Sequence, residues 1–160
     1  TTQLQSSAAS EVYKRQLSVL VDQEWLGKMA YWEDDKIDRI IEDFWPGPLT
    51  LVLPARRKLA EFLKGPNQTI ALRWSSSSVV QEMIKLGECP LIGTSANLSG
   101  MPSCSSSAEV VEQFGDQTPL LVDSGVLPEN PPTTLLDCTR TPFSFIRSGS
   151  IDQKILEDYI

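Results

Sequence analysis

The sequence predicts an α/β protein built on a mixed β-sheet. Short apolar runs bounded by turn-forming residues indicate about seven strands, and segments with apolar side chains at helical spacing lie between them. The last strands follow one another without long helices between them, which is typical of a mixed rather than a purely parallel sheet. At 160 residues, with 41% hydrophobic and 22% charged residues, the chain has the length and composition of one globular domain.

The first half of the chain predicts two strands separated by a helix and a rigid turn. A helix begins near residues 7–13, and the apolar run 17–21 forms a compact strand. Apolar side chains at helical spacing predict a second helix at residues 35–45. Two prolines and a glycine at 46–48 end this helix and turn the chain into a strand at 49–53.

The rest of the chain alternates between helices and strands and ends in a group of strands. Helices are expected at residues 56–64, 77–86, 107–114 and 152–159. Strands are expected at residues 68–74, 90–93, 119–122, 134–136 and 143–146. For the helix at 107–114, the N-cap is Ser105, Ser106 or Ser107, with Glu109 in the first turn.

Composition restricts the chemistry of the chain. The formal net charge of −7 argues against a nucleic-acid binder with a broad basic surface, so small-molecule partners are favoured. There is no histidine, which removes the usual general base and the commonest metal ligand. The three cysteines form no CxxC pair and indicate neither disulfides nor zinc. Without a membrane-length apolar run or a signal-peptide pattern, we expect a cytoplasmic protein.

One loop concentrates small polar side chains. Directly after a predicted strand, the segment 94–102 contains Thr94, Ser95, Asn97 and Ser99. In open α/β sheets, ligands tend to bind beyond the carboxyl ends of strands. Short hydroxyl and amide side chains can bond a phosphate or ribose without blocking its approach. On these residues alone, an ordinary turn remains the alternative.

Five motifs occur in the order seen in one known family. They are FWPGPLTLVLP at 44–54, TIALRW at 69–74, TSANLSGMPS at 94–103, PPTTLLD at 131–137 and FIRSGSI at 145–151. The chain therefore resembles the YrdC-like family of threonylcarbamoyl-AMP synthases, from about residue 12 to its end. The resemblance implies a twisted mixed sheet flanked by helices, the YrdC-like or RibB-like fold, around a concave site. Residues 1–160 are then expected to form one YrdC-like domain that lacks its N-terminal strand.

The resemblance also implies an activity. Family synthases join L-threonine, bicarbonate and ATP into L-threonylcarbamoyladenylate and pyrophosphate, for threonylcarbamoyladenosine formation on tRNA. Such a nucleotidyltransferase binds ATP with its Mg²⁺ beside an amino acid, and its contribution is positioning and charge neutralisation. A chain without histidine can supply both. No catalytic residue and no protein ligand for the metal can be assigned.

The family motifs imply an ATP site formed by seven residues, which are Lys14, Arg15, Thr69, Ser95, Asn97, Ser103 and Arg147. Arg147 follows a predicted strand, where a planar guanidinium can hold phosphate oxygens bidentately, and a surface ion pair is its alternative role. Lys14 and Arg15 stand where the family has Lys-x-Arg, but here they are adjacent. Either a loop is deleted, or residues are missing from the sequence, or the pair is exposed at a helix end.

The implied threonine site consists of Arg73, Gly93 and Thr133. Arg73 is the only charge in its predicted strand and could hold a carboxylate, with a structural salt bridge as the alternative. Gly93 and Thr133 rest on the family alignment alone, as Thr69 and Ser103 do. Each of these four residues, taken in isolation, could be structural.

The chain departs from the family pattern at several points. The family's N-terminal PTxTxYGL motif, which supplies a hydroxyl to threonine, has no match. Leu20 stands where the family often has histidine, and Ser76 to Ser78 replace a His-Pro pair. Thr133 stands where the synthases usually have serine, and PTT at this point also occurs in a YciO-like branch.

Two other functions therefore stay open. A non-catalytic YrdC- or YciO-like protein would bind nucleotide or RNA without forming the adenylate, and a carbamoyltransferase module would turn over carbamoyl phosphate. The partners that the resemblance implies are other tRNA threonylcarbamoylation proteins and tRNA or double-stranded RNA. No membrane partner is expected.

Overall fold

The computed structural model describes residues 16–128 and 130–160, which divide into two compact units. The first unit comprises Thr1–Gly93 and Pro132–Ile160 and contains the sheet, so we call it the sheet unit. The second comprises Thr94–Pro131, and we call it the loop unit. The helix expected at residues 7–13 lies outside the described residues.

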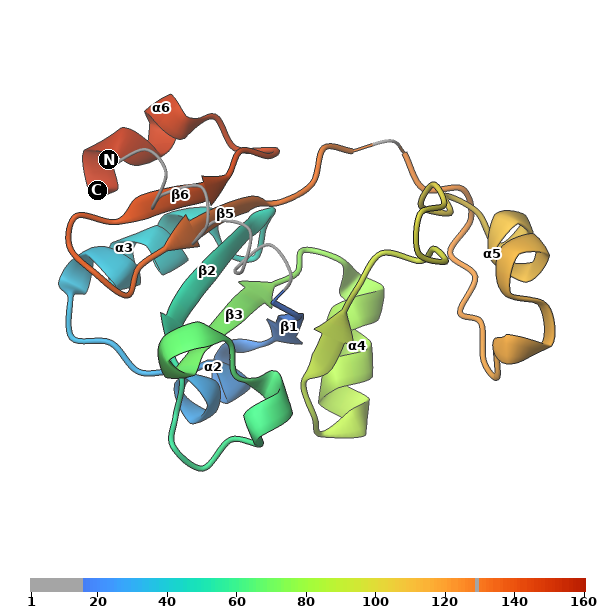
Figure 1. The fold of residues 1–160 in the computed structure, drawn as a ribbon, viewed down its shortest axis with the longest axis horizontal. Coiled ribbons are helices and arrows are strands. Elements are labelled where there is room, and N and C mark those ends of the chain that lie inside the picture. The colour runs from blue at the N-terminus through green and yellow to red at the C-terminus, as the bar shows by residue number, and fades with distance from the viewer. Residues whose placement is uncertain (1–15, 129) are drawn as a thin grey trace. The chain divides into compact units, whose positions relative to one another are not determined.

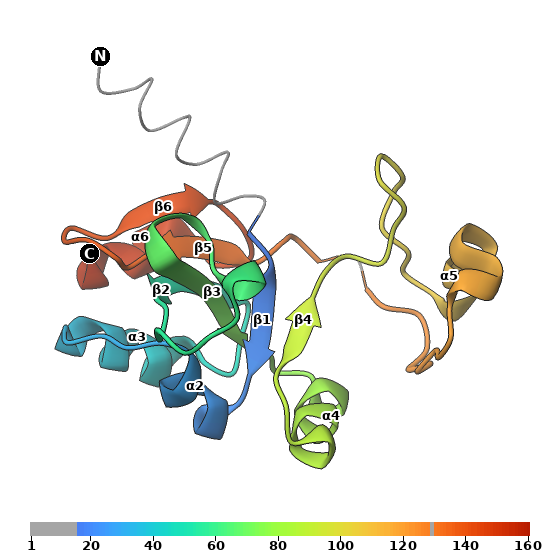
Figure 2. The same ribbon diagram turned by 60° about the horizontal axis from the view of Figure 1, so that its bottom comes forward.

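The sheet unit is a mixed sheet of six strands in the order β4-β1-β3-β2-β5-β6 (Figure 1). The strands are β1 (Ser18–Val21), β2 (Leu49–Pro54), β3 (Thr69–Trp74), β4 (Leu91–Gly93), β5 (Thr134–Asp137) and β6 (Ser144–Arg147). The pairs β1/β3 and β2/β5 are parallel, whereas β1/β4, β2/β3 and β5/β6 are antiparallel. The expected α/β class with a mixed sheet is confirmed, and β4 lies at the edge of the sheet beside β1 (Figure 2).

Three helices bury one face of this sheet. They are α2 (Gln23–Met29), α3 (Asp35–Phe44) and α6 (Gln153–Leu156), and a further helix, α4 (Ser78–Gly87), precedes β4. The main core joins Leu26 and Met29 of α2, Ile37 and Ile40 of α3, and Leu156 of α6 to the sheet. The sheet contributes alternate strand residues, because successive side chains of a strand point to opposite faces. They are Val19, Val21, Leu49, Leu51, Leu53, Ile70, Leu72 and Leu136.

The predicted proline turn joins α3 to β2 and also touches the end of β3. The Trp45 indole Nε1 donates to the Leu49 backbone oxygen at 2.7 Å, and Gly47 N donates to the Trp74 oxygen at 2.8 Å. Only glycine fits at position 47, because a Cβ there would lie 2.2 Å from the Phe44 backbone oxygen. The turn therefore holds the Gly47 carbonyl close to β3.

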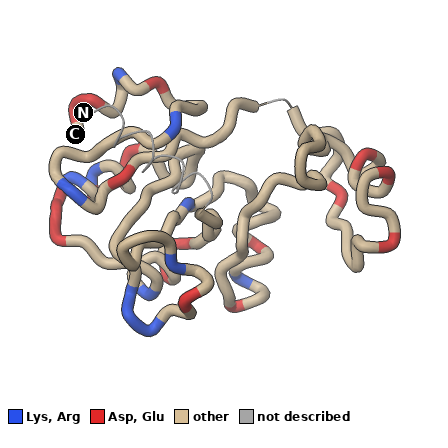
Figure 3. Tube along the Cα trace, viewed as in Figure 1, with Lys and Arg blue, Asp and Glu red and all other residues tan. Residues whose placement is uncertain are grey.

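The loop unit contains one α-helix, α5 (Ser107–Phe114), and has no buried residue among those described. Ser106 is the N-cap, since its hydroxyl accepts from Glu109 N at 3.3 Å, and the Glu109 carboxylate accepts from Ser105 N at 2.7 Å. The capping prediction is confirmed. All 14 Lys and Arg residues of the chain lie outside this unit, whose charged side chains are acidic (Figure 3).

The structure corrects three secondary-structure predictions. Residues 56–64 form no α-helix but a 3₁₀ turn at Glu61–Leu63, because the Arg56 side chain instead bonds the Gly27 and Ala30 oxygens at the end of α2. Residues 119–122 form no strand, since no other strand pairs with them. Helix α2 was not predicted, although Asp22 caps it by accepting from Trp25 N at 3.0 Å.

Two further expectations concern cysteines and membranes. Cys89, Cys104 and Cys138 are all free thiols in the structure. Burial, with Asp137 and Asp34 nearby, raises the pKa of the Cys138 thiol and keeps it protonated. In the described parts of the chain, no helix has the length and apolar character needed to cross a membrane.

Candidate functional site

The sheet face opposite the three helices carries four of the ten predicted site residues, and we call it the polar face. Strand register places Leu20 of β1 beside Arg73 of β3 on this face. A small apolar cluster of Val52, Ala71 and Leu135 lies at its centre. Five polar residues belong to the same face, and they are Thr50, Thr69, Arg73, Thr133 and Arg147.

Arg147 and Thr133 are in direct contact. The Arg147 guanidinium donates from Nε (3.1 Å) and Nη2 (3.0 Å) to the Thr133 backbone oxygen, and from Nη2 to Thr133 Oγ1 at 3.0 Å. A β-bulge between Leu135 and Leu136 shifts the register of β6 at this point. Bulges re-aim side chains, so Ile146 can pack on the apolar cluster while Arg147 turns to Thr133.

Thr50 also contacts Thr133. It was not predicted as a site residue. Its hydroxyl lies 2.9 Å from Thr133 Oγ1, although the two residues are 83 positions apart in the chain. Thr50 is 2% exposed. The available signal was a single hydroxyl within the otherwise apolar run LTLVL, at a position that proved to be fully buried.

Arg73 lies at the end of β3 and is partly buried. Its Nε donates to the Gly47 backbone oxygen at 3.0 Å, so the proline turn orients it. Burial lowers the pKa of the guanidinium from its usual value. None of the carboxylates in residues 16–128 and 130–160 forms an ion pair with it. The structure thus gives no support to a structural salt bridge for Arg73, and its terminal nitrogens remain available to a ligand.

Gly93 faces the position where the family often has histidine. In β4, Gly93 pairs with Ser18, and a Cβ at Gly93 would lie 3.0 Å from Leu20 Cδ2 and Cγ. Leu20 therefore packs over the glycine and pairs with Arg73 on its other side. An aliphatic side chain here offers neither a proton donor nor an acceptor to a ligand held by Arg73.

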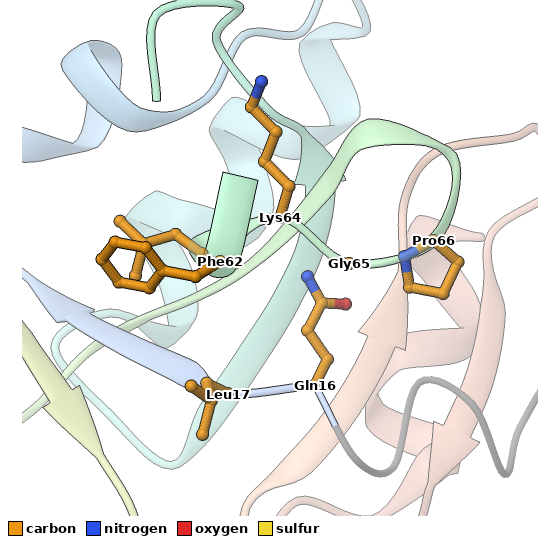
Figure 4. A pocket seen from close by; sticks show the side chains of 7 residues that line it. Gln16, Leu17, Phe62, Lys64, Gly65 and Pro66 are labelled. Carbon is orange, nitrogen blue, oxygen red and sulfur yellow. The ribbon is translucent and has the colours of Figure 1, made fainter. Parts of the chain in front are cut away.

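Thr69 begins β3 and is buried. Its hydroxyl donates to the Pro66 backbone oxygen at 2.8 Å, and its backbone oxygen accepts from the Gln16 side-chain Nε2 at 3.1 Å. The Thr69 hydroxyl proton is therefore used within a turn, and only its oxygen remains as an acceptor. Gln16 points toward Gly65 in an adjacent cavity of about 370 Å³ (Figure 4), whose lining is Gln16, Leu17, Phe62, Leu63, Lys64, Gly65 and Pro66.

The loop unit brings its own three predicted residues together. Ser103 Oγ donates to Asn97 Oδ1 at 3.4 Å, and Asn97 N donates to the Ser95 oxygen at 3.1 Å. A hydrogen bond from Cys104 N to the Ala96 oxygen at 2.8 Å closes the loop. Ser95, Asn97 and Ser103 thus form one compact set of hydroxyl and amide groups.

Two predicted residues, Lys14 and Arg15, lie outside the described part of the chain. Within residues 16–128 and 130–160, no group of three or more Asp, Glu, Cys or His side chains could hold a metal ion. The described residues thus offer no protein cage for Mg²⁺.

The fold and the site together define a class of protein. Arg73 and Arg147 lie on one face of a mixed sheet and have no carboxylate partner among the described residues, while threonine hydroxyls line the same face. Guanidinium and hydroxyl groups in this arrangement suit anionic oxygens of small ligands. The chain is therefore an α/β protein whose mixed sheet presents arginine and threonine side chains on one face.

The chain belongs to the Sua5/YciO/YrdC family, whose model, described as "Telomere recombination", matches residues 11–149. The threonylcarbamoyl-AMP synthase of Pyrococcus abyssi is 32% identical over 126 residues, which cover 79% of this chain and 37% of that protein. The threonylcarbamoyl-AMP synthase of Serratia proteamaculans is 45% identical over 80 residues, which cover 50% of this chain and 42% of that protein. The resemblance inferred from five motifs is confirmed.

Solved structures agree with this assignment. The crystal structure of P. abyssi Sua5 complexed with L-threonine matches with a TM-score of 0.82 and 28% identity, covering 96% of this chain and 48% of that one. Escherichia coli YciO matches with a TM-score of 0.77 at 21% identity, covering 96% of this chain and 77% of that one, which is a likeness of fold alone. The chain spans less than half the length of the two curated relatives.

Proposed function

We propose that this chain carries the threonylcarbamoyl-AMP synthase site. The amine of L-threonine and bicarbonate form a carbamate with loss of water, and a carbamate oxygen attacks the α-phosphorus of ATP and displaces pyrophosphate. The observation that carries the proposal is the contact between Arg147, predicted to bind ATP, and Thr133, predicted to bind threonine. The reaction requires these two ends of the site to be adjacent, because its main demand is the alignment of two substrates.

On the polar face, the geometry supports the proposed roles. Arg73 binds the threonine end of the site through its free terminal nitrogens, beside Gly93 and Leu20. Arg147 uses Nε and Nη2 on Thr133, so its Nη1 is available to an oxygen of the α-phosphate or of the leaving pyrophosphate. A guanidinium that is already fixed in place stabilises developing negative charge without reorganisation.

The remaining proposed ATP contacts come from two places. Ser95, Asn97 and Ser103 of the loop unit offer hydroxyl and amide groups to the nucleotide but no positive charge. We assign the neutralisation of the phosphate charge to Lys14, Arg15 and Arg147. Thr69 contributes its hydroxyl oxygen as an acceptor.

Several finer assignments rest on the same proposal. We assign the nucleotidyltransferase class and a cytoplasmic location, and we treat both units as one YrdC-like domain, since the family match runs through both. As further partners we assign other tRNA threonylcarbamoylation proteins, which would take up the adenylate.

Pyrophosphate release tests the proposed function. With ATP and Mg²⁺ present, we expect release only when both L-threonine and bicarbonate are added, because the attacking carbamate forms from both. A coupled pyrophosphate assay, with D-threonine and bicarbonate-free buffer as controls, measures this. Release that does not depend on threonine, or ATP binding without any release, would contradict the synthase function and favour a nucleotide-binding protein.

A second candidate function, RNA binding, is favoured by one surface. Arg57 and Lys58 follow β2, are exposed, and have no acceptor for their side chains among the described residues, and Figure 3 shows this loop as a concentration of positive charge. Tyr31 (46% exposed) belongs to the same part of the unit, since Arg56 lies over the Tyr31 ring. Exposed aromatic rings and cations together suit stacked bases and phosphates.

We expect the double replacement Arg57→Ala, Lys58→Ala to weaken binding of tRNA or double-stranded RNA. Each lost phosphate contact makes the negative slope of log affinity against log salt concentration shallower by about 1. We therefore expect the slope of the double variant to be shallower than that of wild type by roughly 2. Fluorescence anisotropy with labelled RNA at several salt concentrations measures the slope. Lys85→Ala on α4 is the matched control for the removal of an exposed cation. Equal slopes for wild type and double variant would exclude this surface.

A further inference from the structure

We propose that Thr50 fixes the direction of the hydroxyl hydrogen bonds around Thr133, so that Thr133 can only donate to a ligand, and that the ligand group facing it is an anionic oxygen. Thr50 is a positioning residue in this scheme, since it acts through Thr133. The assignment of the ligand oxygen rests on the proposed function, whereas the direction of the hydrogen bonds does not.

The first step concerns Arg147. A guanidinium has donors and no acceptor, so the 3.0 Å contact between Arg147 Nη2 and Thr133 Oγ1 uses one lone pair of the threonine oxygen. The same guanidinium is held by two further bonds to the Thr133 backbone oxygen. Thr133 Oγ1 is thus an acceptor toward Arg147 in every arrangement of its own proton.

The second step concerns Thr50. Its oxygen lies 2.9 Å from Thr133 Oγ1, and either hydroxyl could donate across this distance. Thr50 is 2% exposed, and no other group of the described residues accepts from its hydroxyl. If Thr133 donated, the Thr50 proton would be buried without an acceptor, which carries the full desolvation penalty of an unpaired polar group. Thr50 therefore donates to Thr133.

The consequence is that the Thr133 hydroxyl has only its proton left for a further hydrogen bond. Both lone pairs of Oγ1 are occupied, one by Arg147 and one by Thr50, so the Thr133 proton points away from both and is free. A free hydroxyl proton requires an acceptor and rejects an ammonium group, and the positive charge of Arg147 beside it favours a carboxylate, carbamate or phosphate oxygen among the acceptors. At the threonine end of the site, this matches the carboxylate or the newly formed carbamate and places the amine elsewhere.

NMR of the hydroxyl protons tests the direction without any ligand. We expect a slowly exchanging hydroxyl signal for Thr50, with nuclear Overhauser contacts to Thr133, and no slowly exchanging signal for the Thr133 hydroxyl. A slow Thr133 proton together with a fast Thr50 proton would overturn the proposal. This measurement gives an answer whether or not the protein makes the adenylate.

Kinetics test the ligand assignment. Thr50→Val keeps the shape but removes the donor, and we expect it to raise the KM for L-threonine about tenfold, with kcat and the KM for ATP within about twofold. Thr50→Ser keeps the hydroxyl and should restore the wild-type KM. Wild type should also discriminate against L-threoninol, which lacks the carboxylate, more strongly than Thr50→Val does. Equal threonine KM values in all three proteins would overturn this assignment, whereas a wild type that releases no pyrophosphate would overturn the proposed function.

Discussion

Replacement of Arg147 by alanine is expected to weaken ATP binding by about 1.5 to 3 kcal/mol, which is roughly 10- to 150-fold, the range for a hydrogen bond to a charged group. The Arg147 guanidinium is held against Thr133 by three hydrogen bonds, and no described carboxylate neutralises it. The variant therefore removes both a fixed positive charge and the support of Thr133. Isothermal titration with ATP measures the affinity, and pyrophosphate release should fall at least as much.

One variant separates the effect of the Arg147 charge from that of its hydrogen-bonding geometry, and a second variant serves as a control. Arg147→Lys keeps the charge, but an ammonium cannot bridge the Thr133 backbone oxygen and hydroxyl while reaching a phosphate, so we expect an intermediate loss. Arg39→Ala removes an exposed arginine that lies over the Tyr159 ring, on the helix side of the sheet, and should leave ATP affinity unchanged. Wild-type ATP affinity in Arg147→Ala would refute a nucleotide role for Arg147.

Local sequence patterns predicted the fold well where an element's structure depends only on its own residues. The spacing in α3 and the hydroxyl cap of α5 needed no distant partner, and both helices formed as expected. Predictions failed where the outcome depends on distant residues. The apolar run 119–122 would be a strand only if another strand paired with it. In the segment 56–64, the side chain of the first residue, Arg56, bonds the Gly27 backbone oxygen of α2.

The candidate site shows the same division. Arg73 and Arg147 were predicted from the family motifs together with their place at strand ends, and the structure adds that neither has a carboxylate partner within the described residues. Thr50 could not be predicted in this way, because its partner lies 83 residues away and their contact depends on the parallel pairing of β2 with β5. Likewise, only the fold shows why position 149, in the IRSG motif, is a glycine.

Gly149→Ala is expected to destabilise the protein by about 3 kcal/mol, at the upper end of the usual penalty for overpacking. A Cβ at position 149 would lie 2.2 Å from the Pro132 oxygen and 2.4 Å from both Thr133 C and Thr134 N. These are backbone atoms, so no flexible side chain can move aside. The backbone must separate instead, and this displaces Thr133 from Arg147 and β5 from its neighbours.

Urea unfolding of Gly149→Ala beside Gly27→Ala distinguishes this effect from a general cost of replacing glycine. Gly27 lies in α2, where an added Cβ would meet nothing within 4 Å, and alanine is the better helix former by up to about 1 kcal/mol. We expect Gly27→Ala to match or exceed the stability of wild type at an unchanged m value. Because the strained backbone in Gly149→Ala includes Thr133, its remaining folded fraction should also bind L-threonine more weakly. Wild-type stability in Gly149→Ala would show that the 145–151 and 131–137 motifs do not approach each other this closely.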